Sequence, residues 1–512
     1  MQAWLYQSLL RVSLAIGLML LALSASAASD SVLPKAVKTL QEQAQTLASQ
    51  HDYLQANQRY EQGLAILLKT QSADTPLVQD WVIEQIMLPV DAGNYATAQG
   101  NYTQAQQAFS QAEKLANDKL ATLPAEAQAT PEQQHYRASL YFGLVVINMH
   151  KGNNAAQQGL QYKLQQETDK AENFLRQAVT DIQTSAHLVR QQGAFISQYH
   201  SGINLSQVNQ TLAGYLTLLA NFYIDQQRAN EALTLLQQTT DLLKTQANDE
   251  HKMISLQAIA QAYRRIPKQL AQAEALLKHV LTYYQQHATE PTKVAFQQLY
   301  LGDFYREQQQ WVEAQNYCQQ ALASARQLQD QELLLSGLIA QAALYIQQHQ
   351  YTQAESLLHE AIALDTTNTA SVTSFPGLLD ASDYAIHAAL LNQLGATYAA
   401  LGQFPQAEQV YNQNLEDHTN TLAPAHPGSK TQSLQGLAKL YGLKQALTLA
   451  LDKAQQAAAD YANHPSGDQE QAQQQRTLAH LQLWIIQQGL HKQSLKANEV
   501  MTTAFQAMQQ AH

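Results

Sequence analysis

Two segments of this chain carry the same side-chain pattern at the same spacing, and this repetition constrains the fold more than any other feature. Residues 301–322 have the sequence LGDFYREQQQWVEAQNYCQQAL, and residues 394–415 have the sequence LGATYAALGQFPQAEQVYNQNL. In both, a Tyr lies 3 residues after a Gly, an Ala 9 residues after the Tyr, and a larger residue 4 residues later. Such recurrence is typical of repeat proteins, in which each unit buries its apolar face only against its neighbours.

Looser copies of the pattern extend along most of the chain. The repeat tyrosines lie 40 residues apart from Tyr223 to Tyr263, 42 on to Tyr305 and 40 on to Tyr345. Apolar residues recur at helical spacing between them, and the 512 residues contain only 20 Gly and 12 Pro. This composition and periodicity favour helices throughout. The copy that ends in Ala171 and Leu175 is predicted to have a disrupted first helix.

The pattern resembles the tetratricopeptide repeat (TPR) family, in which small residues let two antiparallel helices touch and aromatic residues fill the gaps between them. The intervals exceed the usual TPR period of about 34 residues and are similar to the longer kinesin-light-chain type. His426-Pro427, followed by a helix that ends in Leu-Ala-Lys-Leu-Tyr at 437–441, is similar to that subclass. The resemblance implies an all-α fold, an α-solenoid with a right-handed superhelix of antiparallel helix pairs.

The chain divides by composition into several parts. We predict N-terminal TPR-like helical repeats over 35–120, a linker rich in Ala and Pro at 121–134, and a main TPR solenoid over 135–462. An insertion at 366–382, rich in Ser and Thr and with a Pro-Gly pair, is predicted to be a loop of that solenoid. Residues 470–512 are predicted to be C-terminal capping helices.

The first residues have the order of a secretory signal peptide. Arg11 precedes an apolar run from Val12 to Leu23, and Ala25-Ser26-Ala27 follows as an A-x-A cleavage pattern. The run is shorter than the ~20 residues that a transmembrane helix needs. We therefore predict a signal peptide at 1–27, cleavage near Ala27 and an exported protein, periplasmic or secreted. The alternative is an uncleaved segment that anchors the chain in a membrane.

Composition and motifs disfavour several classes of function. The net charge is -11, with 30 basic and 41 acidic residues and no basic run, so nucleic-acid binding is not expected. The 17 histidines are scattered without metal-ligand spacing, and no nucleophile elbow or phosphate-binding loop is present. Cys318 occupies the large apolar position of its repeat and is predicted to be buried. We predict no catalytic, metal-binding or cofactor-binding residues, no cofactor and no small-molecule substrate.

The TPR resemblance implies that the first helix of each pair lines an inner groove. Asn and Gln at inward positions are able to hydrogen-bond an extended peptide, and Arg264 and Arg306 to hold a carboxylate. The alternative for each residue is a solvated helix face. The candidate groove residues are Thr217, Asn221, Gln257, Gln261, Arg264, Asp303, Arg306, Asn392, Gln435 and Lys439.

These observations predict an exported, non-catalytic TPR scaffold that binds a protein or peptide partner through its concave groove. One alternative is a structural or assembly factor of a cell-envelope complex, acting by self-association or outer-face contacts. A second alternative is an enzyme or an enzyme's accessory domain, whose catalytic residues would have to lie outside the repeats.

Overall fold

The computed structural model describes residues 33–200, 204–244, 246–287, 291–367, 383–420, 429–444 and 446–463. The predicted signal peptide at 1–27 and the predicted capping helices at 470–512 lie outside these residues. So does nearly all of the predicted loop at 366–382.

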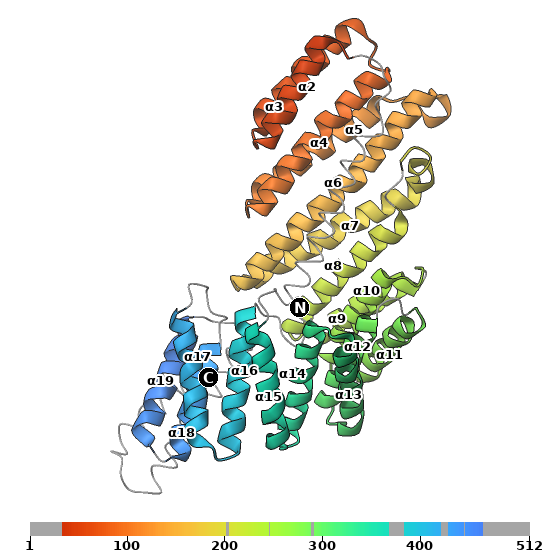
Figure 1. Cartoon of the computed structure of the whole chain (residues 1–512). Coiled ribbons are helices and arrows are strands. Elements are labelled where there is room, and N and C mark those ends of the chain that lie inside the picture. Colours follow the sequence, from red (N-terminus) through yellow and green to blue (C-terminus); the bar gives the residue numbers. More distant parts are fainter. Residues whose placement is uncertain are drawn as a thin grey trace. The chain divides into compact units, whose positions relative to one another are not determined.

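The described residues are helical and contain no strand, so the predicted all-α class is confirmed (Figure 1). The first group of helices comprises α2 (Lys35–Ser49), α3 (Tyr53–Thr70), α4 (Pro76–Ala98), α5 (Tyr102–Thr122), the 3-10 helix η1 (Glu126–Gln128), α6 (Pro131–Leu164), α7 (Thr168–Ile196), α8 (Leu205–Asp225), α9 (Ala229–Lys244) and α10 (Glu250–Arg264). The second comprises α11 (Leu270–Gln286), α12 (Pro291–Glu307), α13 (Trp311–Leu328), α14 (Gln331–Gln347), α15 (Tyr351–Thr367), α16 (Asp383–Ala400), α17 (Phe404–Asn420), α18 (Ser429–Leu443) and α19 (Leu447–Asn463).

Neighbouring helices pack in pairs, and the pairs stack. Helices α4 and α5, α6 and α7, and α8 and α9 form pairs, as do α12 and α13, α14 and α15, and α16 and α17. The first helices of successive pairs also contact each other: α4 packs against α6, α8 against α10, and α16 against α18. This is the predicted solenoid of helix pairs. The right-handed superhelix stays a prediction.

The chain forms two compact units, whose boundary between Ala273 and Glu274 falls inside α11. The predicted linker at 121–134 contains the connection from α5 to α6, with η1 in it. Because α5 packs directly against α6, that connection joins two neighbours of one stack inside the first unit.

A glycine in the first helix sets the contact between the two helices of a pair. A Cβ added at Gly302 would lie 2.6 Å from Sγ of Cys318, well inside van der Waals contact. The two residues are 16 apart in sequence. The same spacing and crowding recur in three other pairs, Gly93 with Phe109, Gly159 with Leu175, and Gly395 with Tyr411.

The prediction of a disrupted helix before Ala171 is wrong, because α6 runs without interruption from Pro131 to Leu164. Buried polar residues interrupt the apolar periodicity of α6, but the helix itself is continuous. Asn148 Nδ2 donates to the carbonyl of Leu144 at 2.8 Å, and Asn154 Nδ2 to that of Tyr102 at 3.2 Å. Amides that find backbone acceptors in this way are compatible with a helix buried on nearly all sides.

Every turn from α2–α3 to α16–α17 that joins the two helices of a pair uses one residue with a left-handed backbone. These residues are His51, Gly100, Gln166, Gln227, Lys268, Gln309, His349 and Gly402, with φ between 57° and 75°. The left-handed conformation lets the chain reverse while a nearby amide closes the helix end, as in the bond from Gln310 N to the carbonyl of Tyr305 (2.9 Å). In the pairs joined by three residues, such as α12–α13 and α16–α17, the turn therefore gives the two helices the same register, whereas the α10–α11 connection is longer.

Candidate functional site

Two of the predicted groove residues are buried on α8. Thr217 and Asn221 are only 4% and 5% exposed. Thr217 Oγ1 donates to the carbonyl of Ala213 at 2.8 Å, and Asn221 Nδ2 donates to the carbonyl of Thr217 at 3.1 Å. Their side chains therefore satisfy the backbone of their own helix, and their burial leaves little of either for a partner to touch.

Asn392, predicted for the same groove, lies in a buried polar network instead. Ser433 Oγ of α18 donates to Asn392 Oδ1 at 2.6 Å. Asn414 Nδ2 of α17 donates to Ser433 Oγ at 2.9 Å and to the carbonyl of Ala388 at 3.0 Å. Asn392 is 8% exposed and Asn414 fully buried. The network fastens three helices, so it accounts for Asn392 as a packing residue.

Asp303 and Arg306 pair with each other one turn apart on α12. Arg306 Nε donates to Asp303 Oδ1 at 3.2 Å, and Asp303 is 6% exposed. Arg306 thus neutralises a buried carboxylate.

The other predicted residues are more accessible. Gln257, Gln261 and Arg264 are half-buried on α10, where Arg264 donates to Gln261 Oε1 at 2.7 Å. On α18, Gln435 is half-buried and Lys439 is exposed. These five side chains keep the accessibility that partner binding requires, and their role in binding stays a prediction.

A polar cluster that the sequence analysis missed joins the ends of three first helices in the unit Leu5–Ala273. Lys163 at the end of α6 and Arg265 just after α10 both form ion pairs with Asp225, the last residue of α8. Arg265 also donates from Nη1 to Asn221 Oδ1 at 3.1 Å. Side chains of Lys163, Asp225 and Arg265 are 27%, 24% and 38% exposed.

We call this cluster the first-helix patch. It consists of Lys163, Asp225 and Arg265, the buried Asn221 that Arg265 bonds, and Gln261 and Arg264, which precede Arg265 at the end of α10. Its cations lie at the carboxyl ends of helices, where the helix dipole favours positive charge. A sequence signal for Lys163 was available. Gly159, Tyr162, Ala171 and Leu175 have the spacing of the best repeat, and Lys163 follows its tyrosine as Arg306 follows Tyr305.

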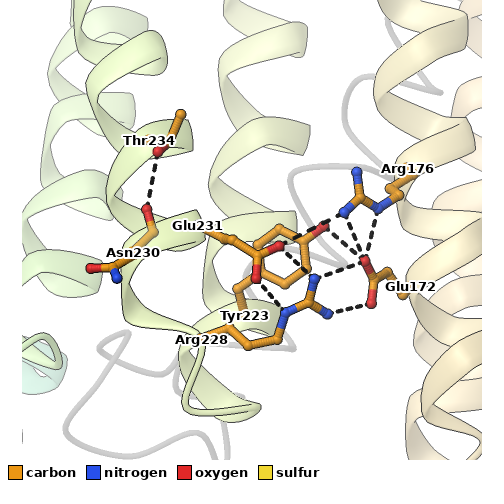
Figure 2. A network of polar contacts seen from close by, with 7 residues as sticks. All are labelled: Glu172, Arg176, Tyr223, Arg228, Asn230, Glu231 and Thr234. Atoms are coloured by element: carbon orange, nitrogen blue, oxygen red, sulfur yellow. Dashed lines mark hydrogen bonds and ion pairs between the residues drawn. The ribbon is translucent and has the colours of Figure 1, made fainter.

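A second network connects α7 to the α8–α9 pair (Figure 2). Tyr223 Oη donates to Glu172 Oε1 at 3.1 Å, and the Arg228 guanidinium lies 4.3 Å from the Tyr223 ring centroid. Arg228 bridges Glu172 and Glu231, and Arg176 Nη2 lies 2.8 Å from Glu172 Oε1. The hydrogen bond from Arg228 is the main cause that lowers the pKa of Glu172 to about 2. All charges in this network are paired, which identifies it as a structural connection.

Contacts of the same kind recur between other pairs, and we call them tyrosine joints. Tyr305 Oη donates to Glu274 Oε1 at 2.7 Å, and Tyr441 Oη donates to Glu408 Oε1 at 2.8 Å. In each case the acceptor directly follows the small Ala of the preceding second helix. The repeat tyrosine therefore packs its ring in the core and holds the previous pair by its hydroxyl.

Cys318 is buried, as predicted, with 1% of its surface exposed. Burial is the main cause that raises the pKa of its thiol to about 12. A thiol that stays protonated near neutral pH is a poor nucleophile, and its sulfur packs against Gly302. Within the described part of the chain, no three His, Cys, Asp or Glu side chains lie close enough to hold a metal ion together. No described helix is long and apolar enough to cross a membrane.

A comparison of the sequence with protein-family models finds a match at one of these helix pairs. Residues 387–428 match the family model of the tetratricopeptide repeat. The matched residues include most of α16 and all of α17, with Gly395 and Tyr411 at their contact. The predicted TPR resemblance is confirmed for this segment. None of the curated proteins compared matches the chain.

Several solved structures are similar to part of the chain. BtubC (BKLC) from P. vanneervenii is 17% identical, with a TM-score of 0.38 over 49% of this chain and 94% of that one. The apo form of RapI is 9% identical, with a TM-score of 0.46 over 83% of this chain and 97% of that one. A putative kinesin light chain from Podospora anserina with TPR-like repeats is 21% identical, with a TM-score of 0.27 over 50% and 99%.

Proposed function

We propose that this chain is an exported, non-catalytic TPR scaffold that binds a protein or peptide partner along the first helices of its repeats. The TPR match at 387–428 and the stacked helix pairs support the scaffold. The observation that carries the proposal is the first-helix patch, where ion pairs bring together partly exposed charged groups from three successive first helices.

The patch has the chemistry that an extended peptide requires. Peptide N–H groups find a carboxylate acceptor in Asp225, and peptide carbonyls or acidic side chains find donors in Lys163 and Arg265. Because Lys163 and Arg265 already pair with Asp225, a partner exchanges existing ion pairs for new ones. Net affinity then comes from a few anchors and is weakened by salt.

The test is in-cell crosslinking followed by mass spectrometry of the captured partners. A patch variant carries Lys163→Ala, Arg264→Ala and Arg265→Ala. A control variant carries Lys114→Ala, Lys119→Ala and Lys244→Ala, which remove the same number of cations from the second helices α5 and α9. Circular dichroism and the thermal midpoint show whether each variant keeps its helices.

The proposal predicts a specific partner that is captured by the wild type and by the control but lost from the folded patch variant. If the folded patch variant captures the same partner at the wild-type level, the patch is not the binding site. If neither the wild type nor the control captures a specific partner, the scaffold function itself is refuted in that cell.

Export is part of the proposal and has its own measurement. Cleavage near Ala27 would leave a mature chain that begins at or next to Ala28. Intact mass and N-terminal sequencing of the protein from its native cell decide this point. A mature chain that still contains Val12 to Leu23 would contradict cleavage.

A further inference from the structure

The contact between α15 and α16 differs from the other tyrosine joints in its chemistry. The repeat tyrosine of α16, Tyr398, has its hydroxyl 2.7 Å from Nε2 of His359 on α15. A second imidazole crosses the same contact, where His387 Nδ1 of α16 lies 2.7 Å from Asp365 Oδ2 of α15. Two histidines therefore take part where the joints at Tyr223, Tyr305 and Tyr441 use glutamate.

The difference matters because of what titrates near neutral pH. A glutamate that accepts from tyrosine keeps its charge throughout that range, whereas an imidazole gains or loses a proton within it. The His359–Tyr398 bond survives either way, since a neutral Nε2 accepts from the hydroxyl and a protonated one donates to it. The Asp365–His387 pair is an ion pair only while His387 is protonated.

The proton on His387 matters for stability because the Asp365–His387 pair is largely buried. The Asp365 side chain is 8% exposed and that of His387 is 20% exposed, so the pair is largely screened from water. Asp417 of α17 adds a second carboxylate near the imidazole, and the hydrogen bond from Asp365 is the main cause that raises the pKa of His387. On α18, which also packs against α16, Lys430 pairs with Asp460 of α19 at 3.0 Å.

We infer that the α15–α16 joint is a pH-sensitive connection, tight while His387 carries its proton and looser once the proton is lost. Deprotonation leaves the buried carboxylate of Asp365 without the positive charge of the imidazole. Because the pKa of His387 is raised in the folded state, its contribution is complete below the unfolded pKa of about 6.5. The contribution falls as pH rises through the folded value.

Hydrogen exchange of the full chain, read by mass spectrometry, tests this inference. Protection in peptides from α15 and α16 is compared at about pH 6 and about pH 8.5, after correction for the intrinsic exchange rate at each pH. We expect protection to fall at the higher pH by about tenfold for each unit by which the pKa of His387 is raised. Peptides from α12 and α13 should change less and serve as the internal reference.

Two variants locate the response. His387→Gln removes the titrating cation and should give low protection in α15 and α16 at both pH values. His359→Gln keeps a side chain able to bond Tyr398 and should retain the pH response of the wild type. The inference is overturned if the wild type shows equal protection at both pH values, or if His387→Gln responds as the wild type does. Loss of protection in α12 and α13 of His387→Gln would indicate general unfolding of that variant. In that case, the pH response of the wild type and of His359→Gln tests the inference.

Discussion

At the scale of single residues, the fit of each helix pair depends on glycines that face a bulky residue of the partner helix. Gly302 faces Cys318 and Gly395 faces Tyr411, and in both cases an added Cβ would lie under 3.0 Å from the facing side chain. Overpacking of this kind is relieved only by moving backbone or side chains. A single methyl group is therefore expected to weaken the pair.

Gly302→Ala is expected to destabilise its unit by about 1–3 kcal/mol, the usual cost of forcing atoms into a packed core. The double variant Gly302→Ala, Cys318→Ala should regain part of that loss, because the nearest remaining contact would be backbone N of residue 318 at 3.4 Å. Urea unfolding of both variants and of Cys318→Ala gives the coupling energy. Additive losses would show that the close contact is not the cause.

His150 provides a second test at the residue scale. Its ring is fully buried on α6, stacked on Phe109 with centroids 6.0 Å apart, and neither nitrogen has a hydrogen-bond partner. Burial lowers its pKa to about 4. The unfolded chain therefore binds the proton more tightly, and stability is lost as pH falls from about 6.5 towards 4.

We expect this histidine to account for roughly 3 kcal/mol of the stability lost across that interval. His150→Leu should flatten the acid limb of the stability curve, whereas His279→Gln, at an exposed position of α11, should not. Unfolding free energies at about pH 7 and about pH 5 make the comparison. Burial raises the pKa of Asp181 to about 6, so its contribution to stability changes with pH in the opposite direction. That contribution is present in the wild type and in both variants. An unchanged pH dependence in His150→Leu would contradict the expectation.

At the scale of elements, the turns inside the pairs place non-glycine residues in a left-handed backbone. Gln309 has φ 57° and Gln227 has φ 59°, whereas Gly402 occupies the corresponding turn with φ 75°. A side chain in this conformation costs roughly 1–2 kcal/mol, and glycine avoids most of that cost. This cost is offset by the packing of the two helices that the turn positions.

Gln309→Gly is expected to stabilise its helix pair by up to about 1 kcal/mol, and Gly402→Gln to destabilise its own pair by a similar amount. Gln308→Gly is the matched control, because its backbone is not left-handed and glycine there adds only freedom to the unfolded chain. Chemical unfolding midpoints measure all three. Equal shifts for Gln308→Gly and Gln309→Gly would show that strain is not relieved.

At the scale of the whole molecule, stability is distributed among neighbours. Within each unit, neighbouring helix pairs contact each other, as α5 contacts α6 and α13 contacts α14, and tyrosine joints such as Tyr223 with Glu172 connect them. In such arrays stability approximates a sum of local terms. A destabilising substitution in one helix pair should therefore lower the stability of that pair and its neighbours, and have little effect on pairs farther along the chain.

Ile182→Ala tests this property. Ile182 is fully buried on α7 and contacts the first-helix residue Gly152 closely enough that an added Cβ would lie 2.9 Å away. We expect a local loss of about 2–5 kcal/mol. Hydrogen exchange should accelerate in α6 and α7, and much less in α16 to α18. A uniform acceleration would point to a single cooperative unit.

Much of the fold was predictable because its signals are local in sequence. Gly302, Tyr305 and Ala314 define one repeat by spacing alone, and the same spacing from Gly159 would have located α6 and α7. The candidate site was harder to predict. Thr217, Asn221 and Asn392 have the polarity of groove residues, but exposure depends on which neighbouring helix covers them, and that neighbour is tens of residues away in sequence.

The sequence by itself determined that this protein is a series of helix pairs, because small and aromatic residues at constant spacing are compatible with little else. Tertiary structure decided which polar groups are buried and which meet. Asp225 is an isolated acid in the sequence, and it joins Lys163 to Arg265 only after three first helices stack. The pairing of His387 with Asp365 likewise exists only where α15 lies against α16. Periodicity acts along the chain, whereas burial and charge pairing arise from contacts between segments that are distant in sequence.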